Sequence, residues 1–279
     1  MNGGGSLATG SLLPFSWELF LAFLLGSILG SFLNVVAFRL PREESLVLPG
    51  SRCPRCGGPI AFYDNIPILS WLLLQGRCRR CRGRISWRYP AVEFVTAFVS
   101  AALWLRWRQS PGWAAAAVLA SGGLIAITLI DWDTFLIPDS LSLGLLAAGL
   151  LVSPINPIFA SPGGWLHACG TSFRGGLVGF ALCWAVAELG ERIFKKEAMG
   201  GGDIKLLAAV GAWTGGLGAF DCLMVGSLLG SAYGLSQIIR GTLRRSDPIP
   251  FGPFLGAGAM LNLFYLLPLG FPFILSLSR

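Results

Sequence analysis

Long apolar runs alternate with short polar segments along most of this chain of 279 residues. A membrane-spanning helix needs roughly 17–25 mostly apolar residues, and eight stretches approach that length. They cover residues 17–40, 90–106, 114–131, 137–153, 173–192, 203–220, 221–240 and 254–277. The pattern predicts an all-α polytopic membrane protein with about eight transmembrane helices. The run at 137–153 and the closely joined pair around Asp221 fit least well.

Composition supports a membrane protein, with 54% hydrophobic and only 13% charged residues, because soluble domains contain about 25% charged residues. A net charge of +7 is compatible with nucleic-acid binding, but the basic residues are concentrated in alternate segments between the apolar runs, as membrane topology predicts. Segments 39–90, 131–139, 192–205 and 240–253 hold 17 of the 21 Lys and Arg residues. Basic loops face the cytoplasm, so we expect the N-terminus outside. We expect contact with membrane lipid and no nucleic-acid partner.

The first basic residue is Arg39. A secretory signal carries basic residues before its apolar core, so we expect the first apolar run to be a retained span. One long hydrophilic segment, 41–89, then divides the chain. The expected parts are a leader with the first transmembrane helix (1–40), a cytoplasmic loop domain (41–89) and a larger transmembrane domain (90–279).

The cytoplasmic loop contains two C-x-x-C pairs, Cys53 with Cys56 and Cys78 with Cys81. Four thiolates complete a tetrahedral structural zinc site, and cytosolic thiols stay reduced, which favours metal over a disulfide. The 21 residues between the pairs slightly exceed the usual ribbon spacing of about 15–20. We predict a small zinc-ribbon-like domain; free or redox-active cysteines are the alternative.

Asp131 and Asp203 each lie where an apolar run meets charged residues, at the expected cytoplasmic ends of their helices. A carboxylate at membrane depth is costly and indicates function. The single histidine, His167, falls in an outer loop, so no Ser-His or Cys-His pair forms near these aspartates. Among the common catalytic groups of hydrolases, a pair of carboxyl groups that share one proton therefore remains. Interface capping of the two helices and a proton-coupled transporter are the alternatives.

Neighbouring residues fit an aspartate pair. Gly200 and Gly202 let the backbone approach a substrate closely, and Asp203 then opens a helix. Asp139 begins another helix, where a carboxylate is a good cap. Lys205 lies close to Asp203 in the sequence, where its charge would influence the pKa of that carboxyl.

Several stretches, in order and over most of the chain, resemble the bacterial type IV prepilin peptidase family, whose members are G-x-G-D intramembrane aspartyl proteases. They are GSILGSFLNVVAFRLP (26–41), the two cysteine pairs, IPILSWLLLQGRCRRCRGRISWRYPAVE (66–93), DWDTFLIPD (131–139), MGGGDIKLLAAVGAW (199–213) and PFGPFLGAG (250–258).

The resemblance implies a multifunctional enzyme of the bacterial inner membrane. It would remove the basic leader of type IV prepilins and the pseudopilins of type II secretion at the cytoplasmic face. It would then methylate the new N-terminus with S-adenosylmethionine. The family's catalytic aspartates map onto Asp131 and Asp203, and Asp139 occupies a supporting position. A peptidase without methyl transfer is the alternative.

The sequence says less about methyl transfer than about peptide cleavage. The family places it in the N-terminal region with the cytoplasmic loop, where Gly76 and Glu93 are candidate contributors. No G-x-G-x-x-G follows a predicted strand, so a soluble dinucleotide-type cofactor fold is not expected. An ion pair with Arg88 or with a neighbouring helix is the alternative role for Glu93. Asn34, within the first span, is expected to hydrogen-bond a neighbouring helix.

Overall fold

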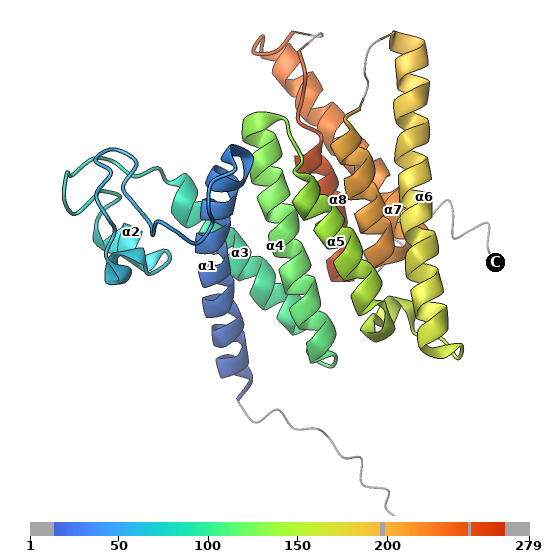
Figure 1. The fold of residues 1–279 in the computed structure, drawn as a ribbon, viewed down its shortest axis with the longest axis horizontal. Coiled ribbons are helices and arrows are strands. Elements are labelled where there is room, and N and C mark those ends of the chain that lie inside the picture. The colour runs from blue at the N-terminus through green and yellow to red at the C-terminus, as the bar shows by residue number, and fades with distance from the viewer. Residues whose placement is uncertain (1–13, 196–198, 245–246, 266–279) are drawn as a thin grey trace, which may run out of the picture.

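The computed structural model describes residues 14–195, 199–244 and 247–265, and these residues form an all-helical bundle with one loop domain at its side (Figure 1). The described part of the chain contains eight α-helices. They are α1 (Phe15–Arg39), α2 (Leu69–Leu73), α3 (Arg88–Arg106), α4 (Pro111–Thr134), α5 (Asp139–Val152), α6 (Gly164–Phe194), α7 (Gly201–Ile239) and α8 (Gly252–Tyr265). The expected leader and the end of the last predicted span lie outside the described residues.

Four helices in the described ranges are long and apolar enough to cross a membrane: α1, α4, α6 and α7. Helices α5 and α8 are apolar but shorter. The all-helical, multi-span fold class is therefore confirmed. Two of the eight predicted spans, 203–220 and 221–240, fall in the single element α7, apart from the last residue of the second span.

Helix α7 is broken at Gly215, whose φ of 78° and ψ of 176° are not helical. Before the break, the ring centroid of Trp213 lies 5.6 Å from that of Trp113 at the beginning of α4. After it, Tyr233 packs 5.6 Å from Trp132 near the end of α4. The two halves of α7 therefore run in opposite directions, as two separate spans would. The sequence placed this boundary at residues 220–221, a few residues too late, because the φ that only glycine adopts readily falls at Gly215.

Small residues bring the helices into direct backbone contact. A Cβ on Gly175 or Gly179 of α6 would collide with the carbonyl oxygen of Gly211 or Leu207 of α7. Glycines at i and i+4 are typical of closely packed helices in membranes. Across another interface, the Asn34 side chain of α1 donates a hydrogen bond to the Tyr89 carbonyl of α3 at 3.2 Å, which confirms its predicted interhelical role.

The ends of the bundle are distinguished by polar contacts. At one end, Arg88 at the beginning of α3 forms an ion pair with Asp133, close to the end of α4. We call this the site end, because α4 ends and α7 begins there. At the opposite end, Glu18 of α1 is buried and forms a 2.7 Å ion pair with Arg108, which follows α3.

Residues 40–87 form the loop domain outside α1 (Figure 1). It holds two short 3₁₀ segments, Leu40–Arg42 and Phe62–Asn65, and the short helix α2. Among its described residues the only β-pairing is two isolated bridges, Arg52 with Pro59 and Arg77 with Arg84. The domain boundaries at residues 40–41 and 89–90 stay a prediction.

Candidate active site

Asp131 lies near the end of α4 and is buried, with 5% of its surface exposed. Its Oδ2 accepts a hydrogen bond from the backbone N–H of Gly252 at 2.8 Å. Gly252 is the first residue of α8, so the carboxylate also lies at the positive end of a helix dipole. The beginning of α8 thus holds the Asp131 side chain in place.

Asp203 lies in the first turn of α7 and is also buried, with 9% of its surface exposed. Its Oδ2 accepts a hydrogen bond from the N–H of Gly200 at 3.2 Å. In return, the Asp203 N–H donates to the Gly200 carbonyl at 3.1 Å. This reciprocal pairing is the geometry of a helix-capping interaction, and it fixes the orientation of the carboxylate at the helix start.

The segment between α4 and α5 passes directly beside the start of α7. A Cβ on Gly202 would lie 2.8 Å from the Cβ of Ile137, whereas a Cβ on Gly201 would meet nothing. Glycine at 202 is therefore required by close approach. The structure thus brings both predicted aspartates to one end of the bundle.

Two supporting residues contact each other rather than the aspartates. Asp139 is the first residue of α5, as predicted, but the capping position before it is occupied by Pro138. The Asp139 side chain accepts two hydrogen bonds of 2.7 Å from the Lys205 ammonium. The expected cap at Asp139 is therefore wrong. Lys205 is likewise engaged by Asp139, so this ion pair ties the start of α5 to the start of α7.

An open groove of about 290 Å³ lies at the site end, and Trp132, which follows Asp131 in α4, contributes to its lining. Aromatic side chains contribute to its lining from both α4 and the end of α7, and its remaining lining comes from the segment before α8. The lining residues are Trp132, Phe135, Tyr233, Gln237, Thr242, Leu243, Pro248, Ile249 and Pro250. Asp131 itself does not line the groove.

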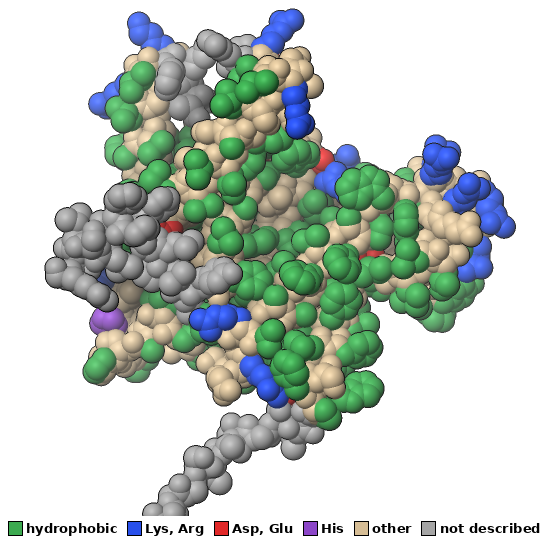
Figure 2. Space-filling view, turned by 180° about the vertical axis from the view of Figure 1, so that it is seen from behind, with side chains coloured by type: hydrophobic (Ala, Val, Ile, Leu, Met, Phe, Trp, Pro, Cys, Tyr) green, Lys and Arg blue, Asp and Glu red, His purple; other side chains and the backbone are tan. Residues whose placement is uncertain are grey.

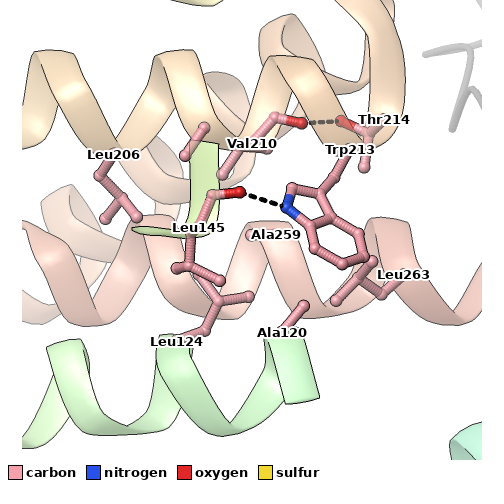
Figure 3. A pocket seen from close by; sticks show the side chains of 10 residues that line it. Ala120, Leu124, Leu145, Leu206, Val210, Trp213, Thr214, Ala259 and Leu263 are labelled. Carbon is pink, nitrogen blue, oxygen red and sulfur yellow. Dashed lines mark hydrogen bonds between the residues drawn. The ribbon is translucent and has the colours of Figure 1, made fainter. Parts of the chain in front are cut away.

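A second cavity lies deeper in the bundle and is too small for a substrate. It is lined by apolar side chains such as Leu124, Leu206 and Val210 (Figure 3). Its volume is about 20 Å³, which is close to the space one water needs. Trp213 borders it and donates from Nε1 to the Leu145 carbonyl at 2.8 Å. This region is packed core rather than a binding site.

The four cysteines of the loop domain come together as predicted. Their sulfur atoms all lie within 4.8 Å of one another, and those of Cys53 and Cys81 are 3.9 Å apart. Sulfur atoms around a tetrahedral zinc, with Zn–S bonds of about 2.3 Å, have nearly this separation. The residues present therefore fit a zinc ion.

The two cysteine pairs occupy equivalent turns. The N–H of Cys53 donates to the Gly58 carbonyl, and the N–H of Cys78 donates to the Gly83 carbonyl, each at 2.9 Å. Within the first turn, the backbone N–H of Cys56 lowers the pKa of the Cys53 thiol to about 7. A lowered thiol pKa favours the thiolate, which is the form that binds metal.

Gly76 and Glu93 both have structural contacts. Gly76 has a φ of +65°, and a Cβ there would lie 2.8 Å from the Trp71 ring. Glu93 is buried in α3, and its Oε2 accepts a 2.6 Å hydrogen bond from the N–H of Ile68. Arg88 pairs with Asp133 instead, so the alternative in which Glu93 forms an ion pair with Arg88 is wrong. The role of Gly76 and Glu93 in methyl transfer stays a prediction, because neither contact forms a cofactor site.

Gly252 is the site residue that the sequence analysis did not single out. A Cβ at this position would lie 2.8 Å from Oδ2 of Asp131, so only glycine allows the carboxylate to reach the backbone N–H. The signal was present in the sequence as a glycine between Phe251 and Pro253, at the start of an apolar run.

Two family models match the chain, over adjacent parts. Residues 24–107 match the bacterial peptidase A24 N-terminal domain, and residues 117–235 match the type IV leader peptidase family. No solved structure matches the chain significantly.

Curated relatives match over nearly the whole length. A prepilin leader peptidase/N-methyltransferase from Aeromonas salmonicida is 38% identical over 88% of this chain and 90% of its own. The protein of that name from Burkholderia pseudomallei is 37% identical over 98% of this chain and 93% of its own. The one from Pseudomonas aeruginosa is 37% identical, with 87% and 88% covered. With both aspartates and the four-cysteine cluster in place, this chain belongs to the type IV leader peptidase family.

Proposed function

We propose that this protein is a prepilin leader peptidase and N-methyltransferase. The observation that carries the peptidase half is the pair of buried carboxyl groups, Asp131 and Asp203, at one end of a membrane bundle. Relatives that share more than a third of its sequence bear both activities in their names. The substrates are prepilins or pseudopilins, cut between a basic leader and an apolar helix.

The peptidase step is general acid–base hydrolysis by the aspartate pair. Two carboxyl groups that face one water share a single proton, because both do not ionise cheaply side by side. The ionised member takes a proton from water, whose oxygen attacks the scissile carbonyl, while the protonated member donates to the carbonyl oxygen. Breakdown of the resulting intermediate breaks the C–N bond and leaves a carboxylic acid and a free amine. The N–H groups of Gly252 and Gly200 orient the two carboxyl groups for this work.

The substrate reaches this pair from the groove lined by Trp132 and Tyr233. A segment in extended conformation fits a groove of this kind, because its backbone groups stay accessible to the polar atoms around it. The apolar helix that follows the leader would remain in the membrane beside the bundle.

The topology we propose has about eight spans with the N-terminus outside and the site end at the cytoplasmic face. The basic residues support it, since 17 of 21 fall in segments assigned to that side. Basic side chains gather on the upper end of the bundle and on the loop domain (Figure 2). Prepilin leaders are positively charged and stay in the cytoplasm, so cleavage would occur on that side.

Zinc held by Cys53, Cys56, Cys78 and Cys81 would have a structural role. Four thiolates fill its coordination shell and leave no position open for a substrate. The methyl donor we propose is S-adenosylmethionine. The contacts of Gly76 and Glu93 support a role in shaping and docking the loop domain, which would position the methyl-transfer site.

A prepilin peptide incubated with the reconstituted enzyme and S-adenosylmethionine, followed by mass spectrometry, tests the proposal. Asp131→Asn and Asp203→Asn should each reduce leader cleavage by about 10²–10⁴-fold, the range for loss of a general acid or base. Asp133→Asn is the matched control, because this exposed neighbour pairs with Arg88 outside the pair. Cleavage at the wild-type rate by either catalytic variant would refute the dyad. A cleaved peptide without an added methyl group would mean that the protein is a peptidase without methyltransferase activity.

A further inference from the structure

Apolar side chains project outward from the loop domain on one side of α2. Leu69, Leu72 and Leu73 are 50%, 59% and 74% exposed, and the nearby Phe62 is 87% exposed. Residues at i, i+3 and i+4 share one face of a helix, so the three leucines form a continuous strip. We call these four residues the α2 patch.

The other side of α2 is packed into the loop domain. The Trp71 indole lies against Gly76 and donates to the Ile85 carbonyl at 3.2 Å. Ser70 is buried, and its hydroxyl donates to the Tyr63 carbonyl at 3.0 Å. One side of α2 is therefore held by the loop domain, and this orientation leaves the leucines on the opposite, exposed side.

The contacts of α2 set its depth along the bundle. Ile68, directly before α2, donates its N–H to Glu93 at 2.6 Å. Glu93 lies five residues into α3, about 7 Å along the axis from Arg88 at 1.5 Å per residue. The preceding residue, Trp87, is 73% exposed, and tryptophan at a helix end is typical of the membrane–water interface. Figure 1 accordingly places α2 below the upper ends of α1 and α4.

The basic and the apolar side chains of the loop domain lie on different sides of it. Figure 2 shows its basic side chains on the upper and outer surface and its apolar side chains below, continuous with the apolar surface of the bundle. Arginines near the cysteine turns, such as Arg80 and Arg82, are exposed. An apolar face with a basic rim is the pattern of segments that lie in the interface of an anionic leaflet.

We infer that the α2 patch inserts into the lipid of the leaflet at the site end and anchors the loop domain on the membrane. The occupant is phospholipid: acyl chains meet the leucines and Phe62, and anionic headgroups meet the arginines around them. Lipid is favoured over a second protein because the patch lies at the depth where bilayer surrounds the bundle. The inference requires a membrane-spanning bundle, but it does not depend on the chemistry of the aspartates.

Spin-label accessibility on the full chain in phosphatidylcholine and phosphatidylglycerol vesicles tests this anchor. The label is attached through a genetically encoded ketone residue at Leu73, so the cysteines remain untouched. Oxygen concentrates in lipid, whereas a water-soluble nickel chelate is excluded from it. We expect a several-fold higher ratio of oxygen to nickel collisions at Leu73 than at the control position Arg80. A second label at Leu69 should behave like the one at Leu73.

Two outcomes would overturn the anchor. Nickel collisions at Leu73 as frequent as at Arg80 would mean that water covers the patch. Low collision rates with both reagents would mean that protein covers it, such as a second copy of the chain. Leader cleavage measured on the same labelled protein tests the aspartate pair separately, so a failure of one proposal is distinguishable from a failure of the other.

Discussion

In the helical bundle, Asp131 and Asp203 are held by helices that pack against one another, whereas the four thiols of the loop domain are held by two small turns. The bundle buries large side chains such as Trp113, Leu206 and Leu255. The loop domain buries mainly its cysteines Cys53 and Cys78. A segment too small to bury a core needs a metal or disulfides for stability. The two regions should therefore fail under different treatments, and each half of the proposed activity should fail with its own region.

Among substitutions that leave both aspartates intact, the largest effect is expected from Gly252→Ala in the bundle. The added methyl would lie 2.8 Å from Oδ2 of Asp131, so the carboxylate must move and lose its backbone donor. A displacement of about 1 Å at a reacting group costs roughly 10²-fold in rate. We expect such a loss of leader cleavage, measured by mass spectrometry, with zinc content unchanged. Gly144→Ala, where a Cβ meets nothing within 4 Å, is the control.

The loop domain should respond next, to removal of its metal. Cys53→Ser together with Cys56→Ser removes two of four thiolates, and zinc binding contributes about 10–16 kcal/mol in small zinc-dependent folds. We expect loss of zinc, rapid proteolysis within residues 40–87 and loss of methyl transfer, with most leader cleavage retained. Cys169 lies outside the cluster, so Cys169→Ser should change neither the zinc content, the proteolysis nor the methyl transfer. An equal loss of cleavage would mean that the two regions are coupled.

A smaller effect is expected from Gly202→Ala. Its methyl would press on Ile137 at 2.8 Å, and overpacking of this kind costs about 1–3 kcal/mol. We expect lower thermal stability in detergent and slower leader cleavage. Gly201→Ala meets no atom within 4 Å and should be neutral or stabilising by up to about 1 kcal/mol. Similar melting temperatures for the two variants would argue against the close approach at residue 202.

The smallest effect concerns Asp64 in the loop domain. Its hydrogen bonds with the Arg79 guanidinium hold the pKa of the Asp64 carboxyl below its ordinary value of 3.8. A pKa lowered by folding stabilises the folded loop above the ordinary value, and this contribution disappears as the pH falls through the folded value. Wild type should therefore resist proteolysis better than Asp64→Asn at pH 5 and only equally in strong acid, as digestion with an acid-active protease would reveal.

Much of the bundle and its site was accessible from the sequence because apolar length and charged borders are local signals. Asp131, Asp203 and the cysteine pairs stood out in this way. Contacts between distant segments carried no such signal. The ion pair of Asp139 with Lys205 joins residues that are 66 positions apart, and the donor at Gly252 is a backbone group that every residue except proline possesses. The break at Gly215 was misplaced because hydropathy does not report dihedral angles.

The glycine contacts between α6 and α7 also bear on how a substrate enters. Backbones that touch at Gly175, Gly179 and Gly211 leave no free space for sliding, so α6 and the first half of α7 should move as one body that carries Asp203. Asp131 is attached through a single backbone hydrogen bond to the beginning of α8. A pilin helix that approaches Asp203 would then meet the α6–α7 pair as a stationary wall of the site.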